Sequence, residues 1–264
     1  MKDNSFDTID TKSFNEARRR TLDLLWPDLH KRAPISSALD VGCGVGIFSE
    51  HLASYGCQVT AIDGREENIA EAQRRTTANV SFSVCDVEDT SVSRAGQFDC
   101  VLCLGLLYHL ENPLRALRNI ASLARHFLVV ESVTAPGNDL KGVLYEEDER
   151  RNQGLTYTAL ILTERCLVKV LYKTGFAHVY RVRTMPNHSQ FHATLTHRQR
   201  RTVLVASREA ISSPLLSRVA EPHTKPYLWD RSYIGLIGSR LVRRLLGRIP
   251  DNKEYSARHA GANR

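Results

Sequence analysis

The feature that most restricts the fold of this chain is a glycine-rich turn between an apolar run and a helical pattern. The turn is Gly42-Cys43-Gly44-Val45-Gly46, with the run SALDV before it and the segment IFSEHLAS after it. Glycine at alternate positions removes side chains, so the backbone can turn sharply and approach a ligand closely. We expect its amide groups, at the N-terminus of a helix, to meet a carboxylate.

Short apolar runs and helical patterns continue to alternate after this turn. QVTAID, VSFSVCD, FDCVLCLGLL and HFLVVES have the length and composition of buried strands, with helical patterns such as REENIAEAQRRT and NPLRALRNIASLA between them. This alternation predicts βαβ units and a parallel sheet. HVYRVRTM and RRTVLVAS predict a closing antiparallel pair. We therefore expect an α/β fold, a doubly wound, mostly parallel, seven-stranded sheet of the Rossmann-like kind.

Three parts of the chain are predicted. Residues 1–35 form an N-terminal helical lead-in, in which apolar side chains at approximate helical spacing predict a helix over residues 14–30. Residues 36–207 form the main domain, and residues 208–264 form a basic C-terminal extension. Within this extension, residues 234–249 place apolar side chains on one stripe and arginines mainly away from it, which predicts a basic amphipathic helix. It either docks on the domain or contacts an anionic membrane surface, nucleic acid or a protein partner.

The polar stretch over residues 133–160 is too long for a simple connector between elements. A stretch of this length inside a compact domain is typical of an active-site lid or a substrate-binding insertion. We expect one of these two roles for it.

The positive charge of the chain is concentrated at its end. The formal charge is +7, and residues 218–264 contain ten Lys or Arg and four acidic residues, so this tail carries +6. The nearly neutral body gives little support for nucleic-acid binding at the main site. No apolar run approaches the ~20 residues of a membrane span, and the N-terminus has no apolar signal region, so we expect a cytoplasmic protein.

Acidic residues follow three of the predicted strands at equal intervals. Asp40, Asp63 and Asp86 are each 23 residues apart, one βα unit. In an open parallel sheet, ligands bind outside the carboxyl ends of the strands. Asp63 is placed to accept hydrogen bonds from two ribose hydroxyls, and Asp86 with the amide of Val87 to hold an adenine edge. The predicted cofactor-binding residues are Asp40, Gly42, Cys43, Gly44, Gly46, Asp63, Gly64, Asp86, Val87 and Leu104.

The spacing of the glycines distinguishes two classes of nucleotide-binding enzyme. A dinucleotide-dependent oxidoreductase needs G-x-G-x-x-G, but position 47 is Ile47. The sequence DVGCGVG over residues 40–46 instead resembles motif I of class I methyltransferases, and the similarity extends over about residues 36–206. The resemblance implies S-adenosylmethionine as the cofactor.

The segment after the fourth predicted strand carries a second resemblance. LLYHLENP over residues 106–113 is similar to a signature of the transfer-RNA wobble-uridine carboxymethyltransferases and their relatives, as are residues 130–132, 172–176 and 201–206. The resemblance implies that Tyr108 and Arg201 contact the carboxylate of a carboxylated donor. About 35 residues precede the region of similarity, so we expect no counterpart of the larger N-terminal part of that family, which supplies a lysine. We therefore expect ordinary S-adenosylmethionine.

Two residues are candidate general bases, and two other groups of side chains, three histidines and two cysteines, are candidate metal ligands. His109 can accept a proton near neutral pH, although it can equally pack against its turn. Glu131 is the second candidate, and Tyr108 and Arg201 complete the predicted catalytic set. A surface loop explains His188, His192 and His197 better than a metal site does. Cys100 and Cys103 point to opposite faces of a strand, so we predict no metal.

The leading hypothesis is a methyltransferase that acts on a small molecule, such as a biosynthetic intermediate or a sugar-containing metabolite. Its motivation is the nearly neutral body and the inserted stretch. The alternative is a transfer-RNA modifying methyltransferase or carboxymethyltransferase with RNA as partner. A third hypothesis is a non-enzymatic, cofactor-binding regulatory or scaffold protein.

Overall fold

A computed structural model describes residues 6–193 and 201–223 of the chain. The described residues up to Pro222 belong to one compact unit. The predicted amphipathic helix over residues 234–249 and His197 lie outside the described residues. Within the described part, no helix has the length and apolar character needed to cross a bilayer. The elements are, in chain order, α1 (Ile9–Arg32), β1 (Ser37–Val41), α2 (Ile47–Ser54), β2 (Gln58–Asp63), α3 (Glu66–Arg75), β3 (Val80–Val84), η1 (Thr90–Ala95), β4 (Phe98–Leu104), η2 (Leu107–His109), α4 (Pro113–Leu123), β5 (Ala124–Val133), β6 (Gly142–Glu146), β7 (Thr158–Leu162), α5 (Glu164–Lys173), β8 (His178–Val182), η3 (Ser189–Phe191), β9 (Arg201–Ser207) and β10 (Leu216–Arg218).

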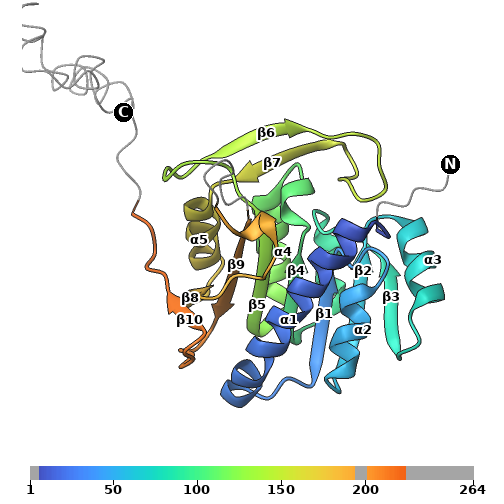
Figure 1. The fold of residues 1–264 in the computed structure, drawn as a ribbon, viewed down its shortest axis with the longest axis horizontal. Coiled ribbons are helices and arrows are strands. Elements are labelled where there is room, and N and C mark those ends of the chain that lie inside the picture. The colour runs from blue at the N-terminus through green and yellow to red at the C-terminus, as the bar shows by residue number, and fades with distance from the viewer. Residues whose placement is uncertain (1–5, 194–200, 224–264) are drawn as a thin grey trace, which may run out of the picture. The chain divides into compact units, whose positions relative to one another are not determined.

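The main sheet has the strand order β10-β8-β9-β5-β4-β1-β2-β3 (Figure 1). β3, β2, β1, β4 and β5 pair in parallel, and β9 pairs antiparallel with both β5 and β8. The predicted doubly wound, mostly parallel sheet and its antiparallel closing pair are confirmed. An eighth strand, β10, adds three residues to the edge beside β8, in a part of the chain predicted as extension.

The sheet changes direction between β1 and β4. From β1 the chain winds outward to β2 and β3, and it then returns to the other side of β1 for β4 and β5. The loops that leave β1 and β4 therefore diverge and open a crevice at the carboxyl edge of the sheet. The glycine turn, which follows β1, therefore lies at this crevice.

Helices cover both faces of the sheet. Buried side chains of α1, α2 and α3 pack on one face, and those of α4 and α5 pack on the other. Adjacent strand residues alternate between the two faces. Cys100 accordingly packs with Leu25 on the α1 side and Cys103 with Leu117 on the α4 side, as predicted.

Helix α1 begins earlier than the apolar spacing predicted. The prediction began at Phe14, but the helix begins at Ile9 because the hydroxyl of Thr8 caps it by accepting a hydrogen bond from the Thr11 amide. Leu25 and Leu29 are fully buried against the sheet. The helix thereby brings its N-terminal half to the carboxyl edge, beside the crevice.

The stretch predicted as a lid or binding insertion contains an antiparallel hairpin. β6 and β7 form a separate two-stranded sheet, joined by a loop over residues 147–157. The Leu160 amide donates to the Leu110 carbonyl at 2.8 Å, which ties β7 to the loop after β4. The hairpin lies across the end of the main sheet in Figure 1. The insertion therefore contributes its connecting loop to the neighbourhood of the crevice.

Candidate active site at the carboxyl edge of the sheet

A cleft with a volume of about 310 Å³ lies at the switch point between β1 and β4. Its walls come from the glycine turn, the ends of β2 and β3, the N-terminal half of α1, η2 and the loop of the β6–β7 hairpin. A concave site of this size suits a small-molecule ligand. The strand ends among these parts meet here because the carboxyl ends of parallel strands share one edge.

The glycine turn has the backbone conformation that its sequence predicted. Gly42, Gly44 and Gly46 have φ values of +69°, +54° and +84°, in the region that favours glycine. A Cβ atom at Gly42 would lie 2.9 Å from the Leu106 side chain. Glycine is therefore needed both for the turn and for its close packing.

The amide groups of the turn differ from the prediction that they meet a carboxylate of a ligand. The amides of Gly42 and Cys43 donate to the Ile62 carbonyl at 2.8 and 3.0 Å, and the Gly44 amide donates to Asp63 Oδ2 at 2.9 Å. These three donors are already used within the protein, because β2 runs directly beside the turn. The turn gives the cleft its shape, and these three amides contact the end of β2.

Asp63 connects the glycine turn with the start of α3. Besides the Gly44 amide, its carboxylate accepts hydrogen bonds from the Arg65 amide at 2.9 Å and from Asn68 Nδ2 at 3.1 Å. Asp63 lines the cleft at the end of β2. A carboxylate has about four acceptor sites, so it retains capacity for a ligand hydroxyl.

The remaining predicted cofactor residues form one wall of the cleft. Asp86 is exposed and accepts from the Glu88 amide at 2.9 Å, whereas Val87 and Leu104 present buried apolar side chains. Gly64 also lines the cleft, and Leu155 of the hairpin loop covers it so closely that a Cβ atom at Gly64 would lie 2.7 Å away.

Asp40 and Gly46 are placed differently from the prediction, because neither lines the cleft. Asp40 is buried, with 2% of its surface exposed, and its Oδ2 accepts from Ser49 Oγ at 2.6 Å. Burial raises the pKa of Asp40 to about 6, and the Ser49 hydrogen bond opposes the rise. Asp40 therefore joins the end of β1 to α2, and Gly46 is the N-cap of α2.

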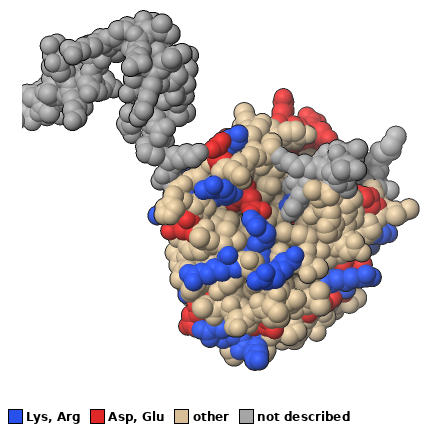
Figure 2. All heavy atoms as spheres, turned by 60° about the vertical axis from the view of Figure 1, so that its left-hand side comes forward, with Lys and Arg blue, Asp and Glu red and all other residues tan. Residues whose placement is uncertain are grey.

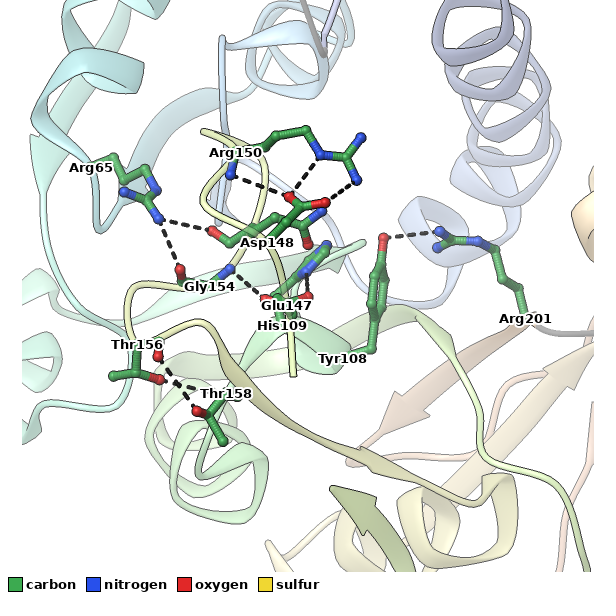
Figure 3. A network of polar contacts seen from close by, with 11 residues as sticks. Arg65, Tyr108, His109, Glu147, Asp148, Arg150, Gly154, Thr156, Thr158 and Arg201 are labelled. Carbon is green, nitrogen blue, oxygen red and sulfur yellow. Dashed lines mark hydrogen bonds and ion pairs between the residues drawn. The ribbon is translucent and has the colours of Figure 1, made fainter. Parts of the chain in front are cut away.

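The opposite wall of the site contains two arginines, Arg18 and Arg201, which are held by a buried carboxylate behind them. Glu131 Oε2 accepts from Arg18 Nη2 at 2.6 Å, and Glu131 Oε1 accepts from Arg201 Nη1 at 2.9 Å. Arg201 Nη2 also donates to the hydroxyl of Tyr108 at 2.9 Å (Figure 3). Both guanidinium groups lie 4.6 Å from the centre of the Phe14 ring.

This arrangement argues against the predicted role of Glu131 as a base. Burial alone would raise the pKa of Glu131, but the charges and hydrogen bonds of Arg18 and Arg201 outweigh burial and lower it. Glu131 also does not line the cleft. A carboxylate with a lowered pKa and two fixed donors is a poor proton acceptor, so its role is to hold the arginines in place.

Arg18 is a site residue that the sequence analysis missed. It projects from α1 into the cleft, and its Nε is buried without a hydrogen-bond partner among the described residues. Its position in the sequence could have indicated this role. Arg18 comes four residues after Phe14, so it lies beside the apolar stripe of the predicted helix. Buried charges of this kind are rare unless they are paired.

Glu147 is a second missed residue, and its partner is the predicted base. His109 Nδ1 lies 2.5 Å from Glu147 Oε1, and Glu147 Oε2 accepts from the Gly154 amide at 2.7 Å (Figure 3). The side chain of Glu147 is 3% exposed and that of His109 is 13% exposed. Nothing in the polar sequence around Glu147 distinguishes it from its acidic neighbours, because only the hairpin brings it to His109.

Of the three histidines for which a surface loop was predicted, the structure describes His188 and His192. His188 Nε2 lies 3.3 Å from Asp10 Oδ1, and the His188 ring contacts Phe14 edge-on. Across residues 6–193 and 201–223, no group of three or more His, Cys, Asp or Glu is arranged to hold a metal ion. His188 contributes to the packing of α1.

Comparison with known proteins finds methyltransferases that are similar to part of the chain. Residues 39–126 match a family model described as a methyltransferase domain. The chain is 40% identical over 95 residues to the ubiquinone biosynthesis O-methyltransferase of Xanthomonas campestris pv. campestris. This match covers 35% of this chain and 40% of that protein. It is 41% identical over 90 residues to the enzyme of the same name from Xanthomonas axonopodis pv. citri. The chain thus spans about 40% of the length of these relatives.

Solved structures resemble a larger part of the chain. The N-terminal domain of EvdMO1 with SAH bound has a TM-score of 0.56 and 21% identity, and the match covers 78% of this chain and 84% of that one. Magnesium protoporphyrin IX methyltransferase from Synechocystis PCC 6803 with bound SAH has a TM-score of 0.51 and 21% identity, over 76% of this chain and 88% of that one. These likenesses concern the fold.

The sheet order and the matched domain define the class. Residues 39–126 match a methyltransferase domain, and the sheet order around them is the mostly parallel order predicted for the class I methyltransferase fold.

Proposed function

We propose that this chain transfers a methyl group from S-adenosylmethionine to a hydroxyl of a small-molecule acceptor. The observation that carries the proposal is the shared cleft, in which the glycine turn and Asp63 lie opposite a histidine, His109, under the hairpin loop. The relatives named ubiquinone biosynthesis O-methyltransferase and a neighbour crystallised with SAH and D-fucose support an oxygen acceptor on a small molecule.

The residues of the cleft fit the cofactor. A Cβ atom at Gly42 or Gly44 would meet Leu106 or Phe6, which line the cleft, Asp63 has acceptor capacity for a ribose hydroxyl, and Val87 with Leu104 offers an apolar wall to an adenine ring. Arg18 lines the cleft, and its positive charge suits the methionine carboxylate. When bound, the sulfonium supplies an activated methyl group.

The protein itself then has two tasks. It must hold the acceptor oxygen in line with the donor, and it must remove the hydroxyl proton. His109 lines the cleft, and in our proposal it accepts that proton. Arg201 and Tyr108 orient a polar part of the acceptor, because their hydrogen bond and the Glu131 ion pair fix both side chains.

One observation favours a second candidate, a transfer-RNA modifying enzyme with a carboxylated donor. Tyr108 and Arg201, far apart in sequence, lie together in the cleft as that resemblance implies. The charged surface gives it less support. Figure 2 shows basic side chains on the face that carries α5, with acidic ones among them, and Lys169 and Lys173 both pair with Glu221. Such pairing reduces the attraction for phosphates.

Transfer of a deuterated methyl group tests the proposal. The full chain is incubated with deuteromethyl-labelled S-adenosylmethionine and a cell extract split into small-molecule and RNA fractions, and products are found by mass spectrometry. We expect a labelled small molecule, and Asp63→Ala to abolish the label through loss of cofactor binding, measured by calorimetry with S-adenosylhomocysteine. Label only in RNA would establish the second candidate, and failure of the cofactor to bind would remove both.

A further inference from the structure

The loop of the β6–β7 hairpin reaches the predicted base and contacts it through an acidic side chain. Glu147, the first residue after β6, lies with Oε1 at 2.5 Å from Nδ1 of His109 (Figure 3). Its other oxygen accepts from the Gly154 amide at 2.7 Å, across the same loop. Glu147 is nearly inaccessible to solvent, so this orientation is fixed by the protein and not by water.

The contact determines which nitrogen of His109 carries the proton. An ionised carboxylate only accepts hydrogen bonds, so Nδ1 of the ring must donate. The neutral ring then has its lone pair on Nε2. Among the described residues, Nε2 of His109 has no hydrogen-bond partner, and His109 lines the cleft. The free lone pair is therefore available to a ligand in the cleft.

The same loop is joined to the cofactor side of the cleft. Arg65 Nη2 donates to the Gly154 carbonyl at 2.8 Å, while the backbone amide of Arg65 donates to Asp63. Arg151 Nη2 donates to Asn68 Oδ1 at 3.0 Å, and Asn68 in turn donates to Asp63. Two short chains of hydrogen bonds thus run from Asp63 to the loop that carries Glu147.

Close packing holds the loop against the base as well. A Cβ atom at Gly154 would lie 2.0 Å from the backbone oxygen of His109, so only glycine allows this approach. The Gly154 amide and carbonyl are both used, by Glu147 and by Arg65. The loop is therefore built to a defined position beside His109.

We propose that Glu147 is a positioning residue of the active site, which holds His109 with its proton on Nδ1 and its lone pair on Nε2 toward the acceptor. The inference rests on the proposed function for the use of this lone pair. The hairpin is then more than a cover, because it completes the base when its loop is seated on Arg65 and Asn68. Loss of the carboxylate that orients the histidine of a Ser-His-Asp triad costs about 10⁴-fold in kcat, so we expect the loss of Glu147 to cost at least tenfold.

Nitrogen NMR of the full chain tests the orientation without an acceptor. Long-range ¹H–¹⁵N spectra of uniformly labelled protein at pH 8.5 distinguish the two neutral tautomers of a histidine, and the spectrum of His109→Gln identifies the signal that belongs to His109. We expect the proton on Nδ1. In Glu147→Gln, one carboxylate oxygen becomes an NH2 group. The Gly154 amide can only donate, whereas the His109 ring can change tautomer, so we expect the remaining oxygen to face Gly154 and the NH2 group to face Nδ1. The Nδ1-protonated fraction should therefore fall.

The matched control is Glu146→Gln, which removes the same charge from the exposed neighbouring residue on β6. The control should leave the tautomer and the rate of deuteromethyl transfer unchanged, whereas Glu147→Gln should lower that rate at least tenfold. Affinity for S-adenosylhomocysteine should stay within twofold in both variants. The inference about Glu147 is overturned if the proton of His109 lies on Nε2 in the wild-type protein, or if the tautomer does not change in Glu147→Gln. Either result is decisive even if no acceptor is methylated. If the protein does not bind the cofactor, it is the proposed function that fails.

Discussion

Replacing Asp40 by Asn should stabilise the protein, and only above a certain pH. The pKa of Asp40 is raised from 3.8 to about 6, chiefly because burial disfavours the charged form. The unfolded chain therefore loses this proton before the folded one does, and stability falls as the pH rises from 3.8 through about 6. At 1.36 kcal/mol per pKa unit, the penalty reaches about 3 kcal/mol above this window.

Asp40→Asn removes the penalty and keeps an oxygen that accepts from Ser49 Oγ. The free energy of unfolding, measured by urea titration with the fluorescence of buried Trp26 and with circular dichroism, should rise by up to about 3 kcal/mol at pH 8. At pH 4 the gain should be below about 1 kcal/mol, because Asp40 is then protonated in the folded protein.

Asp99 provides the control of opposite sign. It is also a buried strand aspartate, and burial acts to raise its pKa, but hydrogen bonds from Ser36 and Ser37 outweigh burial and lower it. Its ionised form therefore stabilises the fold, and Asp99→Asn should destabilise the protein at pH 8. The reasoning fails if Asp40→Asn is destabilising at pH 8, or if its effect is the same at pH 4.

Two further substitutions test the other buried contacts. Glu131→Gln leaves Arg18 and Arg201 buried without their counter-charge. The free energy of unfolding, measured by urea titration, should therefore fall by about 3–5 kcal/mol. A loss below about 1 kcal/mol would contradict the ion-pair role of Glu131. Gly154→Ala brings a Cβ atom into contact with the backbone oxygen of His109 and displaces the loop. The free energy of unfolding, measured by urea titration, should fall by about 1–3 kcal/mol. A value within about 0.5 kcal/mol of wild type would argue against the close contact.

The fold could be predicted from the sequence because the features that determine it are local. Short apolar runs, helical spacing and the glycine turn each depend on neighbouring residues, so they predict the strand and helix order without knowledge of contacts. The turn at Gly42 and Gly44, the acid at Asp63 and the wall at Val87 follow from the same rule, since parallel strands end at one edge. The N-terminal start of α1 at Ile9 was missed because a cap at Thr8, and not apolar spacing, sets it.

The sequence by itself determined the βαβ order, the glycine turn and the set of side chains at the strand ends. Only the tertiary structure decided what those side chains do, because burial and partners fix the role of an ionisable group. Asp40 and Asp63 look alike in sequence, yet one is buried under the turn and the other faces the cleft. Glu131 is enclosed by arginines, and the acid beside His109 is Glu147, contributed by a hairpin 38 residues away. Contacts over such separations leave no periodic trace in the chain.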